Sequence, residues 1–460
     1  MTLSRMRRPA GMVANLLFTA CAVAAEGLPF AARAADLLQT FNDALSCDLV
    51  YASARSQYQA TQEKYPQGLS QLLPTIICTG STRKTSLGFL NNSGVTRDFS
   101  TTGWQVTLTQ PLFAWDCWES YKQGELLAAA GEVALVQACY DLITRTAQAY
   151  FDVLTAQDNL DLARSKLNSI NRQFEQAKRN FEAGTSTITD TNEAQSRLDL
   201  GKAAEIAAAS DLDTKRDVLQ QIIGKAPDTL RGLRVKAAIP GPEPLAPDDW
   251  IKQAEQFNPT VTSAQINLDY LHCDRNKAIA GHLPSVALTG ARGYTNQTGT
   301  TTSVSPSQLY TTNIGVQVTI PLFAGGYTQS RVRETIALED KGRTDLESAR
   351  RGAAQAARAA FLGLSSRLAQ VKALKAAERS AALSLESNKL GYEVGVRINI
   401  DVLNAQDQLY TTRAQLAKVR YDTIVAGLRL KAAANVLKDE DVGLVNSLLA
   451  DGSNPSTSAK

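Results

Sequence analysis

Apolar residues recur every three or four positions along a stretch that begins near Trp115 and ends near Gly184. The stripe consists of Leu126, Ala129, Val133, Val136, Tyr140, Ile143, Ala147, Tyr150, Leu154, Leu167, Ile170, Phe174, Ala177 and Phe181. Such heptad spacing predicts a coiled-coil helix, and no proline interrupts the chain between Pro111 and Pro227. A helix of this length would reach about 100 Å at a rise of about 1.5 Å per residue. We therefore expect an elongated helical bundle.

The same pattern occurs a second time in the chain. Three pairs of residues share one constant spacing, namely Pro74 with Pro284, Pro111 with Pro321, and Phe151 with Phe361. The spacing then increases by one residue for Gly184 with Gly395, Asp190 with Asp401, and Gln195 with Gln406. So long a repeat indicates a duplicated unit of helix, β-hairpin, long helix, tight turn and helix.

The repeat divides the chain into segments. Residues 35–226 form the first repeat, 227–247 a proline-rich linker, 248–440 the second repeat and 441–460 a C-terminal tail. In the first repeat, we expect a helix over 36–65 that ends at Pro66, and a helix over 189–223 after the tight turn. In the second repeat, one helix is expected over 250–279. The residues after 450 are polar and favour disorder.

Two short stretches in each repeat alternate apolar and polar residues, which predicts strands. They cover 76–82 and 104–109 in the first copy and 284–290 and 314–320 in the second, separated by polar loops at 85–98 and 295–312. Four strands with free edges cannot span lipid alone, so a membrane barrel requires several chains. The long loops and the aromatic residues near the strand ends favour an outer-membrane barrel, with a periplasmic sheet on a coiled-coil stalk as the alternative.

The first 34 residues have the features of a secretory signal peptide. Arginines precede an apolar run over 11–25, and Ala32-Arg33-Ala34 offers a cleavage site. Ala20-Cys21 is an alternative lipoprotein site, but Phe18 stands where such sites usually have Leu or Val, so cleavage near Ala34 is favoured. No run of about 18 apolar residues follows the leader, and we expect no membrane-spanning helix.

Charge and composition exclude several classes of function. The chain has 48 Lys and Arg against 45 Asp and Glu, which argues against a nucleic-acid partner. The two histidines, His272 and His282, make a histidine-based metal or catalytic centre improbable on composition. We identify no nucleophile–base pair, metal cluster or cofactor loop. The sequence therefore predicts no catalytic, metal or cofactor site, and a protein that is not an enzyme.

The duplicated unit, its strand-to-helix junctions and its turn segments together resemble the TolC family of outer-membrane channel proteins. The junctions are Pro111-Leu112-Phe113 and Pro321-Leu322-Phe323, and the turn segments are residues 181–195 and 392–406. The resemblance covers nearly the whole chain after the leader. It implies a mixed α and β membrane protein, in which a homotrimer shares a 12-stranded β-barrel with four strands per chain. A long α-helical coiled-coil tunnel would continue the barrel into the periplasm.

The resemblance also implies an export function. The chain would form the outer-membrane exit duct of a tripartite machine, in contact with outer-membrane lipid. Its partners would be a periplasmic adaptor of the membrane fusion type and an inner-membrane transporter, expected to be of the ABC type. The cargo is either a protein or a small molecule. We favour type I protein secretion, as in exporters of the haemolysin or cyclolysin type. Drug or small-molecule efflux and a periplasmic coiled-coil scaffold are the alternatives.

Finally, the resemblance implies a channel gate at the two turns. Thr189 and Asp190 would bond to Tyr392 and Arg397 and hold the tunnel closed, while Asp401 would form a ring of carboxylates. The best-known member of the family has a second acidic ring where this chain has the neutral Asn404, which predicts a weaker preference for cations. Helix capping is an alternative role for Thr189, Asp190, Asn399 and Asp401, because all four stand near helix starts.

Overall fold

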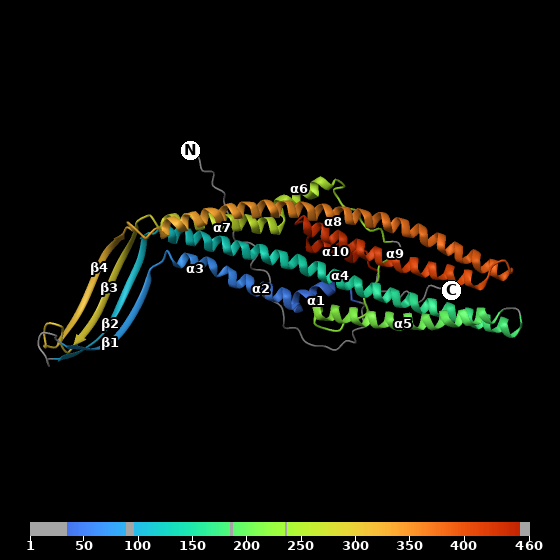
Figure 1. The fold of residues 1–460 in the computed structure, drawn as a ribbon, viewed down its shortest axis with the longest axis horizontal. Helices are drawn as coiled ribbons and strands as arrows, with labels where there is room; N and C mark the ends of the chain where they lie inside the picture. The colour runs from blue at the N-terminus through green and yellow to red at the C-terminus, as the bar shows by residue number, and fades with distance from the viewer. Residues whose placement is uncertain (1–34, 89–95, 185–186, 235–236, 451–460) are drawn as a thin grey trace, which may run out of the picture.

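The computed structural model describes residues 35–88, 96–184, 187–234 and 237–450. The predicted signal peptide, with Cys21, and the residues after 450 lie outside the described residues. The molecule is elongated, with a sheet at one end and a bundle of helices along the rest of its length (Figure 1). This arrangement confirms the mixed α and β fold expected from the sequence.

The helices occupy most of the chain. They are α1 (Leu37–Cys47), α2 (Leu49–Gln62), α3 (Lys64–Ser70), α4 (Trp115–Glu182), α5 (Ile188–Ile223), α6 (Pro247–Phe257), α7 (Pro259–Ala280), α8 (Tyr327–Glu393), α9 (Asn399–Ala433) and α10 (Asp439–Ser447). The two longest, α4 and α8, have 68 and 67 residues and are the two rods of the duplicated unit. They lie along the molecular axis and carry the shorter helices beside them (Figure 1).

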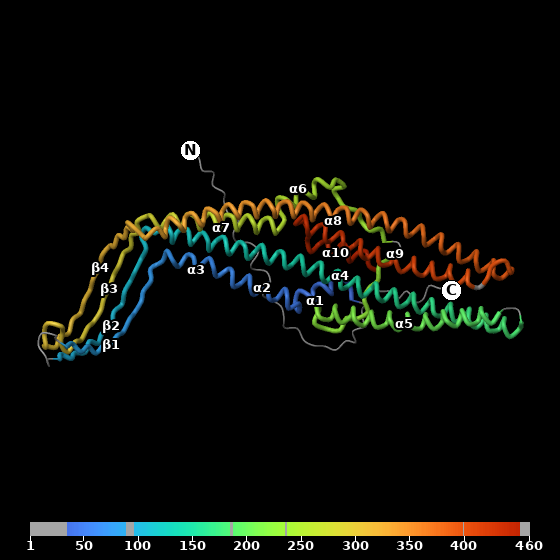
Figure 2. The backbone as a smooth tube through the Cα atoms, viewed as in Figure 1, coloured from blue at the N-terminus to red at the C-terminus, as the bar shows by residue number. Residues whose placement is uncertain are grey.

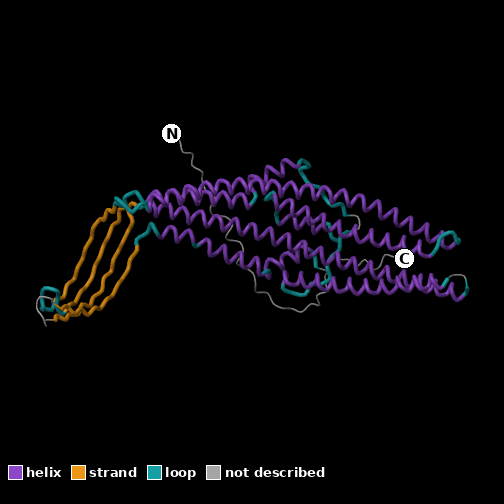
Figure 3. Tube along the Cα trace, viewed as in Figure 1, coloured by secondary structure: helices purple, strands orange, loops and turns teal. Residues whose placement is uncertain are grey.

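The four strands form one antiparallel sheet in the order β1-β2-β3-β4. The sheet is drawn in orange at one end of the molecule in Figure 3. They are β1 (Thr75–Gly88), β2 (Thr96–Phe113), β3 (Ser285–Gln297) and β4 (Ser307–Thr319). The hairpin of one repeat joins that of the other through β2 and β3, with Thr109 opposite Thr289. Strands β1 and β4 therefore form the two outer edges of the sheet within one chain.

Strand ends differ from those expected. β1 continues to Gly88 and β2 begins at Thr96, so much of the polar loop predicted at 85–98 is strand. Likewise, β4 begins at Ser307, inside the loop predicted at 295–312. Within a single chain, nearly all residues of β1 and β4 are exposed on both faces of the sheet. Neither face has to be apolar for burial, so polar residues interrupt the alternation there. Hydrophobic periodicity detects a strand only where one face is buried.

The helix expected over 36–65 is divided into α1, α2 and the start of α3, with breaks at Asp48 and Glu63. Two further differences in the helices involve prolines. Pro66 was expected to end the first helix, but it lies in the first turn of α3, where a helix tolerates a missing N–H. Pro259 divides the helix expected over 250–279 into α6 and α7. Asn258 caps the second of these, because its Oδ1 accepts a hydrogen bond from the Thr260 N–H at 2.9 Å.

The largest hydrophobic core lies midway along the bundle, where α1, α4, α5, α9 and α10 meet. Aromatic rings form its centre, with the ring centroids of Phe151 and Tyr421 5.5 Å apart. Val442 and Leu449 are also buried in this core. The first part of the segment predicted as a C-terminal tail therefore belongs to the fold. It contains most of α10, and Leu449 forms a β-bridge with Leu233.

One stretch of α4 is more apolar than expected. An 18-residue window of this helix has a mean hydropathy of 1.5, and 17% of the window is buried. By length and composition it meets the requirement for a membrane span, which the sequence analysis expected no helix to meet. Core helices pass the same test, so hydropathy alone does not assign a span. The low buried share shows that this stretch of α4 is only partly covered within one chain.

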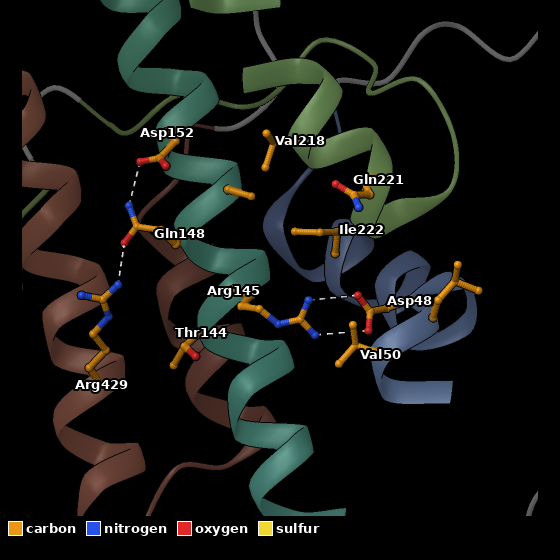
Figure 4. Close-up of a pocket in the computed structure, with 12 residues that line it drawn as sticks. Asp48, Val50, Thr144, Arg145, Gln148, Asp152, Val218, Gln221, Ile222 and Arg429 are labelled. Atoms are coloured by element: carbon orange, nitrogen blue, oxygen red, sulfur yellow. Dashed lines mark hydrogen bonds and ion pairs between the residues drawn. The ribbon is translucent and has the colours of Figure 1, made fainter. Parts of the chain in front are cut away.

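A nearly buried carboxylate fixes the junction of α1 and α2 on α4 (Figure 4). Both oxygens of Asp48 accept hydrogen bonds from the guanidinium of Arg145, at 3.2 Å each. Asp48 also caps α2, because it accepts from the Tyr51 N–H at 2.7 Å. The pair lies at the wall of a cavity of about 410 Å³. One side chain thus starts a helix and ties it to the rod.

Asp48→Ala should lower the free energy of unfolding by about 2 kcal/mol, because it removes a cap and leaves Arg145 without its carboxylate. Leu49→Ala is the matched control, since this neighbouring side chain is 80% exposed. The control should change the free energy by less than about 0.5 kcal/mol. Urea unfolding followed by circular dichroism measures both, and equal effects of the two substitutions would contradict the role of Asp48.

Asp158 is a second carboxylate within the core. Burial raises its pKa, and the hydrogen bond that it accepts from the Tyr421 hydroxyl at 2.8 Å acts in the opposite direction. The folded state therefore holds a proton on Asp158 more tightly than the unfolded state does. As a result, the contribution of Asp158 to the free energy of unfolding falls as pH rises through the raised pKa. The hydrogen bond from the Tyr421 hydroxyl stabilises the charged form of Asp158.

Tyr421→Phe should destabilise the protein by about 1–3 kcal/mol at pH 7.5, since the charged Asp158 loses its donor. The loss should shrink at acid pH, where Asp158 is protonated and the missing hydroxyl matters less. Thermal midpoints at pH 7.5 and at acid pH test this, with Tyr140→Phe in the same bundle as the control. A loss that is the same at both pH values would exclude the coupling to Asp158.

Candidate channel site at the distal helical turns

Two tight turns lie together at the end of the molecule furthest from the sheet (Figure 2). One joins α4 to α5 and the other joins α8 to α9. Each contains a glycine in the left-handed region, Gly184 at φ 73° and Gly395 at φ 77°. A side chain is disfavoured there, which explains why both repeats have glycine at this position. The turns place the predicted gate residues at one tip.

The first turn uses its polar residues to begin α5. The carboxylate of Asp190 accepts hydrogen bonds from the Thr187 N–H at 3.1 Å and the Thr187 hydroxyl at 3.0 Å. In return, the Asp190 N–H donates to the Thr187 hydroxyl at 3.3 Å. This reciprocal arrangement is a capping box. Thr189 is exposed beside it, so the capping role weighed for Asp190 is present in the structure.

The second turn folds back on its own backbone. The N–H groups of Val396 and Arg397 both donate to the carbonyl of Gly391, at 2.8 and 3.0 Å. This bend brings the guanidinium of Arg397 to 3.6 Å from the carboxylate of Asp401. Both side chains are partly exposed, so water and salt screen the attraction between them. The turn thus presents a cation and an anion side by side at the tip.

Two further gate residues have partners on the other repeat. The Tyr392 hydroxyl accepts a hydrogen bond from the Asn180 amide of α4 at 3.3 Å. The Asn404 carbonyl oxygen accepts one from Arg197 of α5 at 3.1 Å. Among the described residues, no hydrogen bond or ion pair joins Asp190 to Tyr392 or to Arg397 within one chain. The structure therefore brings Arg397 and Asp401 together, and does not bring Thr189 or Asp190 to Tyr392 or Arg397 within one chain.

Polar contacts that the sequence analysis did not identify join α4 to α9 above the tip. The ammonium of Lys166 pairs with the carboxylate of Asp407. One turn further, the hydroxyls of Ser169 and Tyr410 lie 3.4 Å apart. These contacts join the two repeats across more than half of the chain. The sequence pattern of the repeats does not predict these contacts, because the paired residues do not occupy equivalent positions in the two copies.

The helices that carry the tip form an open row. Contacts join α5 to α4, α4 to α9 and α9 to α8, so α5 and α8 are the outer members. Both outer helices expose large apolar side chains, with exposed fractions of 65% and 71% for Leu200 and Ile206 of α5, and of 64% and 62% for Leu383 and Leu390 of α8. Apolar residues at the sides of a row indicate surfaces that another protein surface covers.

The described residues contain no group of three or more histidine, cysteine, aspartate or glutamate side chains that could hold a metal ion. His272 instead approaches the carboxylate of Glu339 at 3.6 Å. Cys273 is buried beside Glu119, and burial raises the pKa of its thiol to about 11. A thiol with such a pKa stays protonated at neutral pH and is a poor ligand.

Comparison with known proteins supports a channel. The model of the family described as "Outer membrane efflux protein" matches residues 41–225 and 250–436. The outer membrane protein TolC of Vibrio cholerae serotype O1 is 31% identical over 422 residues, which cover 91% of this chain and 95% of that protein. The alkaline protease secretion protein AprF of Pseudomonas aeruginosa is 29% identical over 436 residues, covering 92% and 89%.

A solved structure has the same fold. The Campylobacter jejuni CmeC outer membrane channel superposes with a TM-score of 0.75 at 17% sequence identity, covering 91% of this chain and 90% of that chain. The family match spans both repeats and most of the described residues. The chain belongs to the outer membrane efflux protein family.

Proposed function

We propose that three copies of this chain close into a duct through which a tripartite export machine delivers cargo across the outer membrane. The observation that carries the proposal is the open form of a single chain. Strands β1 and β4 are unpaired edges, and α5 and α8 expose apolar residues at the corresponding sides of the helical row. Lipid cannot satisfy the free N–H and C=O groups of an edge strand, so the edges must pair between copies.

With four strands from each of three copies, the sheets close into a twelve-stranded barrel. Twelve strands lie within the range known for outer-membrane barrels. The same rotation places α8 of one copy against α5 of the next, so both sets of exposed apolar side chains become buried. The protein is an outer-membrane member of its family, with its helices in the periplasm. The family consists of channel-forming proteins, which supports the sequence prediction that this chain is not an enzyme.

A duct in the outer membrane needs partners that supply energy and cargo. Because it has no energy source of its own, it requires an inner-membrane transporter, for which an ABC type is expected. It also requires a periplasmic adaptor that joins the transporter to the tip. The cargo is exported protein in the favoured case. Support comes from AprF, which is named for protease secretion and resembles this chain over nearly its whole length. The family description names efflux, and efflux of small molecules is the second candidate.

Complementation separates the two branches. The chain is expressed in a bacterium that lacks its own duct but retains a type I exporter and a drug-efflux transporter with their adaptors. The secreted protein in the medium and the inhibitory concentration of a drug are then measured. Restored secretion without restored drug resistance is the expected result, and the reverse would favour efflux. The vector without the chain is the control for both readings.

A gate at the tip completes the proposal. In a trimer, the tips bring together three copies of Asp401, each beside Arg397. The guanidinium offsets the repulsion among the three carboxylates and is available to Thr189 and Asp190 of the neighbouring copy. Tyr392 and Asn404 hold the two repeats of each copy in place through Asn180 and Arg197. The neutral Asn404 leaves Asp401 as the acidic ring at this level.

Arg397→Ala should enlarge the single-channel current of the purified protein in a planar bilayer. Exposed ion pairs contribute up to about 1 kcal/mol, so their loss raises the open fraction, and with it the time-averaged current through each channel, by up to about fivefold. Repulsion among the Asp401 carboxylates then acts without its counter-charge. Arg358→Ala, an exposed arginine on α8 away from the tip, is the matched control and should leave the current unchanged. Equal currents for Arg397→Ala and the wild type would assign Arg397 a structural role.

A further inference from the structure

The four-stranded sheet has one apolar face and one polar face. The apolar face carries Val106 and Leu108 of β2 and Ile314, Val316 and Val318 of β4. The intervening residues face the opposite side and are Gln105, Thr107, Asn313, Gly315 and Gln317. The register places both apolar sets on one face, because Gly290 of β3 lies opposite both Leu108 and Ile314. In a closed barrel, the apolar face meets lipid and the polar face lines the channel.

A row of aromatic residues crosses the apolar face. Trp104, Tyr294 and Tyr310 lie opposite one another on β2, β3 and β4. The ring centroids of the two tyrosines are 4.8 Å apart. Beyond this row, towards the end of the sheet remote from the helices, the same face becomes polar, with Thr102, Asn296 and Gln308 next in register (Figure 1). Because the helices lie in the periplasm, the row marks the outer boundary of the apolar band, where hydrocarbon meets lipid headgroups.

A charged residue lies inside the apolar band. Arg292 of β3 is the next residue on this face below the aromatic row, and it lies opposite Val106 and Thr312. Its side chain is exposed. No described residue accepts a hydrogen bond from its guanidinium or forms an ion pair with it. A charged group without a partner is costly in hydrocarbon, so this guanidinium requires an anion or water at the membrane surface.

The arginine side chain is long enough to reach that surface. Tyr294 follows Arg292 by two residues, about 7 Å along the strand. An extended arginine spans a similar length, and its apolar stem can stay in hydrocarbon while its charged end lies among headgroups. The guanidinium thus reaches the level of the aromatic row, where the hydroxyls of Tyr294 and Tyr310 are further donors. A forked guanidinium and two phenol hydroxyls together match the oxygens of a phosphate group.

We propose that Arg292, Tyr294 and Tyr310 bind the phosphate group of a lipid in the outer leaflet of the membrane. Each copy in the trimer has one such site. The acyl chains of the lipid lie against Ile314 and Val316, on the periplasmic side of Arg292. The inference rests on the proposed closure of the sheet into a barrel, and is independent of the gate and of the cargo. It goes beyond the proposed function because it assigns a lipid-binding site to the outer surface of the barrel.

Native mass spectrometry of the full-length protein in detergent tests the site, and the probe is lipid A, a glucosamine disaccharide lipid with two phosphates. The intensities of lipid-bound and lipid-free trimer give an apparent affinity, and we expect up to three tightly bound lipids. Arg292→Leu should weaken binding about tenfold or more, because the charge-assisted contact with phosphate is lost. Tyr310→Phe keeps the ring but removes a donor, and should weaken binding about two- to tenfold.

Arg83→Leu is the matched control. Arg83 is an exposed arginine of β1, and it lies opposite Thr101 on the polar face of the sheet. The substitution makes the same charge change away from lipid and should alter the affinity less than about twofold. Circular dichroism confirms the fold of each variant, and Tyr310→Phe still tests the site if Arg292→Leu does not assemble.

Four outcomes would overturn the proposal. They are an unchanged affinity in Arg292→Leu, an equal loss in Arg83→Leu, equal binding of the same lipid without its phosphates, and binding of inorganic phosphate without binding of the lipid. A trimer that carries no lipid at saturating probe would contradict the lipid site alone. Protein found only as single chains would contradict the proposed duct and, with it, this lipid-facing site.

Discussion

The architecture depends on the need to pair every backbone hydrogen-bonding group that meets lipid. One chain satisfies this need for β2 and β3 but leaves one edge of β1 and one edge of β4 free. A membrane offers no water to replace the missing partners. The sheet is therefore a segment of a larger closed object, and the exposed polar and apolar side chains on both faces of β4 have the same explanation.

The helical part follows from the same closure. A strand that ends at the base of the barrel leads directly into α4, whose length carries the chain far from the sheet. Lys166 and Asp407 join the two repeats into one curved row, and Asp48 and Arg145 attach the shorter helices to its middle. The outer helices of the row, α5 and α8, expose large apolar side chains along its two sides. The glycine turns then complete the row at the tip.

Much of this fold was predictable from the sequence, for identifiable reasons. The rods were found because apolar residues recur along them at heptad spacing, and the duplication because glycines and prolines recur where the backbone requires them. Strand ends at Gly88 and Ser307 were missed because those strands bury neither face within one chain. Contacts at the tip, such as that between Asn180 and Tyr392, join residues that are not equivalent in the two repeats. No local sequence pattern predicts such contacts. The gate residues followed from family resemblance, whereas the structure shows Asp190 first as a helix cap.

The central claim is that this chain is one third of a closed duct. Native mass spectrometry of the detergent-extracted protein tests it directly, because the detergent is removed in the gas phase and the assembly is weighed. A single species with three times the mass of the mature chain is the predicted result. A species with the mass of one chain, from protein whose circular dichroism shows the helices intact, would contradict the account.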